Sequence, residues 1–235
     1  APDGIPHDVA FDHGKIIGTR IGDQFMAVLW EDGVLTELGT IEGSGTSGAA
    51  LNDAGQAVVH PQDIILPPPY LWARGVYTPL GKLPGYTFTA AADINDLGQV
   101  AGEASNSVLD TRTVLWRDGT INDLGNLGFH GAAAINDLGQ VVANNYLWDN
   151  GILTDMGSFG PVGPGSTRAL DVNNLGQVVG ESLDENSDYL PFLWEDGTMT
   201  LLTDLVSLPG SPDPAQVGVY AINDVGQILV TAGET

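Results

Sequence analysis

The sequence predicts an all-β fold, a β-propeller of four-stranded repeats of about 41 residues, because two short motifs alternate along the chain. The first motif has the form Ala-Ile-Asn-Asp-Leu-Gly-Gln and occurs at 50–56, 93–99, 134–140, 171–177 and 221–227, with a diverged copy at 9–15. The second motif, Leu-Trp-x-x-Gly, begins at Leu29, Leu71, Leu115, Leu147 and Leu193. The glycines of the first motif are 41, 43, 41, 37 and 50 residues apart, which is the length of one propeller blade.

Each repeat is expected to form four strands, A to D, and residues 88–125 give the example. Runs rich in β-forming residues at 88–95, 98–103, 111–116 and 120–124 predict the strands. Asn95-Asp96-Leu97-Gly98 predicts a tight A–B turn with a left-handed glycine, and Asp118-Gly119 predicts a tight C–D turn. These two turns lie at one end of a blade, the turn end, whereas the variable B–C and D–A loops lie at the other, the loop end.

The number of motif copies predicts how many blades the chain forms. Six copies of the first motif but only five of the second favour six blades with the last one half-built; five blades is the alternative. We expect a single domain over 1–235, with repeats at 5–46, 47–87, 88–129, 130–165 and 166–214 and a half repeat at 215–235. The half repeat stays two-stranded, continues in a longer chain, or is completed by strands from another molecule.

Composition limits the classes of partner. Thirty acidic against seven basic residues give a formal net charge of -23, which disfavours nucleic acid because phosphate contacts need Lys or Arg. No apolar run approaches the roughly 20 residues of a membrane-spanning helix, so we expect no membrane insertion. The absence of cysteine excludes disulfides and thiol chemistry. The first residues, Ala-Pro-Asp-Gly, look like a mature terminus left after signal removal and favour export.

Ala-Ile-Asn-Asp-Leu-Gly-Gln-Val-Val at 134–142 and Leu-Trp-Arg-Asp-Gly-Thr-Ile-Asn-Asp-Leu-Gly-Asn-Leu-Gly at 115–128 together resemble the bacterial HAF-repeat family of extracellular proteins. The resemblance covers essentially the whole chain. The residues before each Trp, such as Arg112-Thr113-Val114, depart from the His-Ala-Phe that names the family. The resemblance implies export, to the medium or the cell surface, and a propeller-like fold, but it brings no catalytic residues.

Two repeated features have both a structural and a functional interpretation. The five Trp residues could present sugar-stacking rings, but a residue at one position of every repeat is usually packing, so we expect them to fill the gaps between blades. Eleven acidic residues fall in the tight turns and could collect cations, but Asp is also what such turns select.

The best metal candidate is the predicted B–C loop of the fifth repeat. Asp184, Asn186 and Asp188 have the spacing of the first half of a calcium loop, and Glu181 is the expected fourth ligand. Tyr189 stands where an EF-hand needs glycine. Calcium binding and a plain solvated acidic loop both stay open.

Catalysis finds little support in the sequence. A carbohydrate-active propeller would need carboxylates around its axis, and only Asp8, Asp93 and Asp171 depart from small residues near strand A. The four histidines show no metal-ligand spacing and no serine partner. We therefore expect no enzyme, with a carbohydrate-active enzyme as one alternative.

Function is expected in the segments that deviate from the repeat. Ile64, Ile65 and Leu66 place apolar groups in a loop ahead of three prolines, and with Tyr70 and Tyr189 they are the predicted ligand contacts. The leading hypothesis is a secreted or cell-surface, non-enzymatic scaffold that binds a glycan or protein through its loops. The alternative is a structural subunit that self-associates through 216–235.

Overall fold

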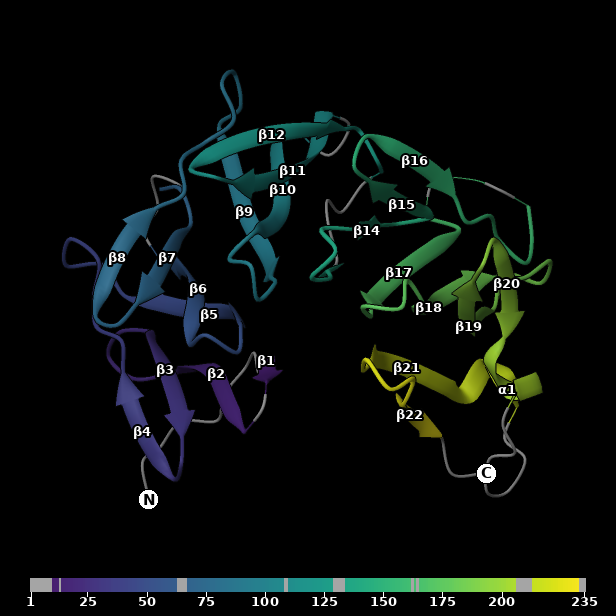
Figure 1. Cartoon of the computed structure of the whole chain (residues 1–235), viewed down its shortest axis with the longest axis horizontal. Coiled ribbons are helices and arrows are strands. Elements are labelled where there is room, and N and C mark those ends of the chain that lie inside the picture. The colour runs from purple at the N-terminus through teal and green to yellow at the C-terminus, as the bar shows by residue number, and fades with distance from the viewer. Residues whose placement is uncertain are drawn as a thin grey trace. The chain divides into compact units, whose positions relative to one another are not determined.

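The computed structural model describes residues 10–12, 14–62, 67–107, 110–128, 134–161, 163, 165–205 and 213–232 (Figure 1). The chain divides into two compact units, Ala1–Gly125 and Asn126–Thr235, and the division falls between the third and fourth sheets. Over the described ranges, no helix has both the length and the apolar character needed to cross a membrane.

The first unit contains three antiparallel four-stranded sheets, one for each of the first three repeats. Their strands pair in chain order, as a propeller blade requires. The first sheet holds β1 (Ala10–Asp12), β2 (Lys15–Arg20), β3 (Met26–Glu31) and β4 (Val34–Glu37); the second holds β5 (Thr46–Leu51), β6 (Gln56–Pro61), β7 (Tyr70–Ala73) and β8 (Val76–Pro79); the third holds β9 (Phe88–Ile94), β10 (Val100–Ser107), β11 (Asp110–Arg117) and β12 (Thr120–Gly125).

The second unit contains two four-stranded sheets and one two-stranded sheet. The fourth sheet holds β13 (Ala134–Ile135), β14 (Val141–Ala143), β15 (Tyr146–Asp149) and β16 (Ile152–Asp155); the fifth holds β17 (Thr167–Val172), β18 (Val178–Leu183), β19 (Tyr189–Glu195) and β20 (Thr198–Leu201); α1 (Leu202–Leu205) and the short helix Pro214–Gln216 lead to β21 (Val217–Ile222) and β22 (Ile228–Ala232). The prediction of six repeats with a half-built last one matches this arrangement (Figure 1).

The local geometry agrees with the expected turns. Gly98 has a φ of 74°, and Asp118 and Gly119 have φ values of 54° and 72°. Two successive left-handed residues fit the twist of a tight hairpin. Strand B of the example repeat, β10, continues to Ser107, four residues beyond the expected end.

Strand A bulges at one position in several repeats, and in the third and fifth sheets a glycine of strand B lies against the bulge. The pairing shifts between Ala101 and Gly102 in the third sheet and at Ala169 in the fifth. A Cβ on Gly102 or Gly180 would overlap the carbonyl oxygen of a strand A residue. Glycine is required there because the two backbones approach closely.

Apolar clusters fill the space between consecutive sheets of each unit. Trp116 packs in a cluster with Leu71 of the second sheet, and Trp194 packs in one with Leu147 of the fourth. The exposed fractions of Trp116 and Trp194 are 3% and 7%, so the expectation that tryptophans fill the gaps between blades is confirmed for these two. Trp30, in the first described sheet, is 46% exposed.

Candidate functional site

One asparagine side chain holds the A–B turn in each of the second to sixth repeats. After β17, Asn173 Oδ1 accepts hydrogen bonds from the backbone N–H groups of Leu175 (3.1 Å) and Gln177 (3.0 Å), and its Nδ2 donates to Gln177 Oε1 (2.7 Å). The bond from the glutamine N–H to the asparagine oxygen recurs at Asn52, Asn95, Asn136 and Asn223. The motif therefore encodes a turn whose backbone donors are satisfied by its own side chains.

The same asparagines connect consecutive blades within a unit. Nδ2 of Asn52 donates to the carbonyl oxygen of Asn95 (2.9 Å), and Nδ2 of Asn173 donates to that of Asn223 (3.0 Å). Nδ2 of Asn136 donates to the carbonyl oxygen of Asn173 (2.9 Å). Asn52, Asn136 and Asn173 are only 1%, 4% and 3% exposed, so these bonds satisfy groups that would be costly to bury alone.

Carboxylates of the turn end take part in these links. The backbone N–H of Asp53 donates to Asp96 Oδ1 (2.8 Å) in the first unit. In the second unit, the N–H of Asn174 donates to Asp224 Oδ1 (2.7 Å), and its Nδ2 donates to Asp137 (2.8 Å) and to Asp224 Oδ2 (2.7 Å). The aspartates thus connect neighbouring turns, which supports the interpretation that turn chemistry accounts for them.

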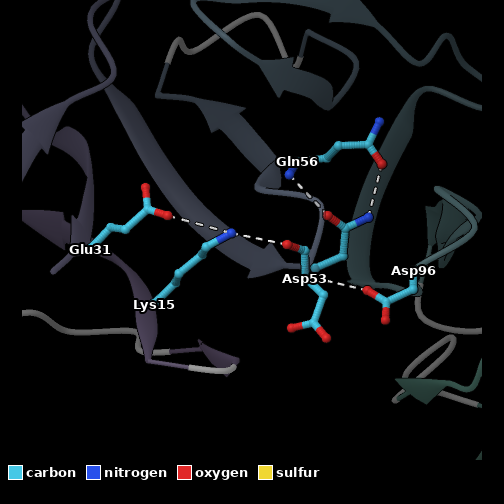
Figure 2. A network of polar contacts seen from close by, with 6 residues as sticks. Lys15, Glu31, Asp53, Gln56 and Asp96 are labelled. Carbon is cyan, nitrogen blue, oxygen red and sulfur yellow. Dashed lines mark hydrogen bonds and ion pairs between the residues drawn. The ribbon is translucent and has the colours of Figure 1, made fainter.

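The diverged first repeat makes the connection with a lysine. Lys15 stands where the other turns have glutamine, and its Nζ donates to the carbonyl oxygen of Asp53 (2.9 Å) and lies 3.5 Å from Glu31 Oε1. Figure 2 shows Lys15 between Glu31 and the turn that carries Asp53 and Gln56, with Asp96 on the far side of that turn. The network in Figure 2 therefore joins three consecutive repeats and serves their assembly.

Asp93 and Asp171, considered as axial catalytic carboxylates, accept backbone hydrogen bonds. Asp171 Oδ1 accepts from Val172 N–H (2.8 Å) and Oδ2 accepts from Ile222 N–H (2.8 Å) in the next strand A; Asp93 Oδ1 accepts from Ile94 N–H (2.8 Å). Burial raises the pKa of Asp171, although the two N–H donors act in the opposite direction. Asp8 lies outside the described residues.

The predicted calcium loop forms a turn that its own side chains close. Asp184 Oδ1 accepts from the N–H groups of Asn186 (2.8 Å) and Asp188 (2.9 Å), and Asn186 Nδ2 donates to Asp184 Oδ2 (3.0 Å). The bond from Asp188 N–H is the largest cause that lowers the pKa of Asp184. Glu181 lies on β18 opposite Pro191. No set of three or more His, Asp or Glu side chains in the described ranges is placed to hold a metal ion. Calcium binding stays an untested prediction.

Tyr189, one of the predicted ligand contacts, forms a cluster at the loop end of the fifth blade. Its hydroxyl donates to the carbonyl oxygen of Gly165 (3.1 Å), and the guanidinium carbon of Arg168 lies 4.1 Å from the centre of its ring. Arg168 is exposed, whereas Tyr189 is partly buried. The tyrosine therefore holds an exposed guanidinium by a cation–π contact.

Tyr70 contributes to packing in the second sheet. It packs against the cluster between the first two sheets, and its ring meets that of Tyr77 edge to face, with centroids 6.3 Å apart. Burial raises the pKa of Tyr77. The other predicted contacts of this loop, Ile64, Ile65 and Leu66, lie outside the described residues.

A second Tyr–Arg cluster, which the sequence analysis missed, lies at the loop end of the third blade. Arg112 Nε donates to Tyr86 Oη (2.9 Å), and that hydroxyl donates to Asp110 Oδ1 (3.1 Å). Asn106 Nδ2 donates to Asp110 Oδ2 (3.1 Å). The bond to Tyr86 raises the pKa of Arg112. The sequence could have indicated this cluster, because no other repeat has a tyrosine and an arginine at the positions of Tyr86 and Arg112.

Polar residues near the end of strand B form a further set that sequence reasoning missed. Thr19 Oγ1 accepts from Gly48 N–H (3.2 Å), and His60 Nε2 accepts from Ala91 N–H (3.1 Å), each in strand A of the next blade. Both lie four residues after the Lys or Gln of the first motif. Glu103, Asn144 and Glu181 share that position, so a polar residue recurring four after the glutamine was the available signal.

Comparison with known proteins supports the fold and nothing finer. No family model and no curated protein matches the chain. Among solved structures, the chain is similar to TolB from Acinetobacter baumannii (TM-score 0.58, 16% identity, 93% of this chain and 61% of that one). It is also similar to the gluconolactonase XC5397 from Xanthomonas campestris (TM-score 0.50, 14% identity, 93% of this chain and 79% of that one). A third similar structure is PorZ, a surface component of the type-IX secretion system of Porphyromonas gingivalis (TM-score 0.51, 13% identity, 94% of this chain and 38% of that one).

The fold is a β-propeller. The all-β architecture of four-stranded blades predicted from the repeats is confirmed by the sheets and by these similarities. At identities of 16% or less, the similarities concern the fold alone. The chain spans 61% of the length of the TolB structure.

Proposed function

We propose that this β-propeller is a secreted or cell-surface, non-enzymatic scaffold that binds a neutral glycan or a protein through its loop ends. The observation that carries the proposal is the pair Arg168 and Tyr189, in which a partly buried ring orients an exposed guanidinium. A guanidinium offers five N–H donors in a fixed plane, which suits hydroxyl and carbonyl oxygens of a ligand.

The turn ends support this choice by contrast. Their asparagine and aspartate side chains accept or donate the hydrogen bonds that close turns and connect blades, as Asn173 and Asp224 do. The pair Arg112 and Tyr86 gives the third blade a similar held guanidinium at its loop end. The net charge of -23 disfavours polyanionic ligands, which is why we propose a neutral glycan or protein.

Export rests on the resemblance to HAF-repeat proteins, which implies an extracellular location. The enzyme alternative requires carboxylates available to a substrate, and Asp171 is occupied by two backbone N–H donors. The structural-subunit alternative is supported by the two-stranded sixth repeat.

The test is a binding screen of the purified protein on an array of neutral and acidic glycans, followed by titration calorimetry of the best ligand. We expect Arg168→Ala to weaken binding at least tenfold and Tyr189→Phe to weaken it less. Arg74→Ala is the matched control, because it removes an equal charge from an exposed C–D turn. If Arg168→Ala binds as tightly as the unchanged protein, or if neither glycans nor candidate proteins bind, the proposal is wrong.

A further inference from the structure

The last described strand of the sixth repeat, β22, has one edge that pairs with no other described strand. Over the described residues, β22 pairs only with β21, whereas each of the other five repeats continues from strand B to a strand C and a strand D. A strand edge offers backbone N–H and C=O groups to any chain that can pair with it. The edge of β22 therefore has the position that strand B has in a blade before strand C is added.

The five complete blades share one register between strands B and C. The residue directly after the Gln or Lys of the first motif faces the Trp of the second motif, and the following residue faces the Leu. The pairs with Trp are Ile16–Trp30, Ala57–Trp72, Val100–Trp116, Val141–Trp148 and Val178–Trp194, and those with Leu are Ile17–Leu29, Val58–Leu71, Ala101–Leu115, Val142–Leu147 and Val179–Leu193. In the sixth repeat, Ile228 and Leu229 hold these two positions.

The turn glutamine adds a third point of recognition. Gln140 Nε2 donates to Asp149 (3.1 Å) and Gln177 Nε2 donates to Glu195 (2.6 Å), and both acids directly follow the Trp of their blade. In the first repeat, Lys15 lies 3.5 Å from Glu31, which has the same position. Gln227 is the equivalent residue of the sixth repeat, and it is exposed.

The apolar cluster between the fifth and sixth sheets contains no strand C residue of the sixth repeat among the described residues. The cluster between the fourth and fifth sheets includes Phe192 and Trp194 of strand C, whereas that between the fifth and sixth has only residues of strands A and B from the sixth repeat, such as Val219. Leu229 is 62% exposed. Its equivalents Ile17, Val58, Val142 and Val179 are buried in the clusters that their blades form with the following sheet, so Leu229 lies on the face that a following blade covers in the other repeats.

We propose that the β22 edge binds a β-hairpin of the type Leu-Trp-(Glu/Asp)-x-Gly, and that this hairpin completes the sixth blade. Its Leu pairs with Leu229, its Trp pairs with Ile228 and covers Leu193 of the fifth blade, and its acid accepts from Gln227. Backbone pairing supplies affinity, and the Leu, Trp and acid positions supply specificity. This interaction is separate from ligand binding at the loop ends.

The test uses the 235-residue protein and a labelled synthetic peptide with the sequence of residues 26–37, which contains Leu29-Trp30-Glu31-Asp32-Gly33. Fluorescence anisotropy measures binding, and hydrogen exchange locates it. We expect saturable binding with slowed exchange at 228–232. The control peptide carries Ser in place of Leu29 and Trp30, and we expect it to bind at least tenfold more weakly.

The matched protein variants are Leu229→Asp on the edge and Val225→Asp in the preceding turn, where the side chain is 77% exposed. We expect Leu229→Asp to weaken peptide binding at least tenfold and Val225→Asp to leave it unchanged. Hydrogen exchange on the unchanged protein keeps the test valid if Leu229→Asp fails to fold. Equal binding of the two peptides, protection elsewhere, or a protein dimer that the peptide does not dissociate would each overturn the proposal.

Discussion

Asn173→Ala tests whether the asparagine of the first motif connects blades as well as closing its own turn. The substitution removes four hydrogen bonds, two accepted from Leu175 and Gln177 and two donated to Gln177 and Asn223. With Asn173 only 3% exposed, a net contribution near the middle of the range of about 0.5–1.5 kcal/mol per bond predicts a loss of about 4 kcal/mol.

Asn223→Ala is the matched control in the same unit. Asn223 makes the three bonds within its own turn, to Val225 and Gln227, but its side chain is exposed, so we expect a loss of about 1.5 kcal/mol from the low end of that range. A third variant, Asn173→Asp, keeps the oxygen acceptor and replaces the donor to Asn223 by an oxygen. It therefore removes both donated bonds, to Gln177 and to Asn223, and keeps the two accepted ones.

Calorimetric melting measures all three, since it resolves separate transitions if the two units unfold independently. At about 2–4 °C per kcal/mol for a chain of this size, Asn173→Ala melts about 5–10 °C below Asn223→Ala. Asn173→Asp falls between the unchanged protein and Asn173→Ala. Equal melting temperatures for the two alanine variants would refute the reasoning, because the inter-blade bond and the burial would then contribute nothing.

Two further predictions concern the backbone approach in strand B and the buried carboxylate in strand A. Gly180→Ala is expected to lower the melting temperature strongly, because the added Cβ overlaps the carbonyl oxygen of Arg168. Gly163→Ala is the control and should change the melting temperature little, because the space around its added Cβ is open. Equal shifts in the two melting temperatures would contradict the packing argument. Burial raises the folded pKa of Asp171, so its ionised form destabilises the fold, and this destabilisation grows as pH rises from the unfolded value of 3.8 through the raised folded value. The variant Asp171→Asn cannot ionise, and its single amide oxygen can accept from only one of the two N–H groups. We therefore expect urea unfolding from pH 3 to pH 6 to show the variant less stable than the unchanged protein, with a difference in unfolding free energy that shrinks as pH rises. A difference that stays constant over this pH range would contradict the assigned titration.

Much of the fold follows from the sequence because each repeat states the same local rule. Gly98 had to be left-handed for its turn to close, and its φ of 74° agrees. The bulge beside Gly102 was not predicted, since it arises from the close approach of two backbones and leaves no periodic pattern in strand A. The role of His60 was also missed, because its partner is a backbone N–H in the next repeat, and no side-chain spacing reports such a pair.

The candidate site was harder to predict than the fold because a site is defined by what the repeat does not explain. The Asp and Asn residues of the turns recur and are used between turns, as with Asp96 and Asn174. Arg168 and Tyr189 do not recur as a pair, and nothing in blade assembly requires a guanidinium over a tyrosine ring at an exposed loop end. Because Arg168 is exposed and its guanidinium lies over the Tyr189 ring, these two residues are the ones to mutate when the proposed binding is tested.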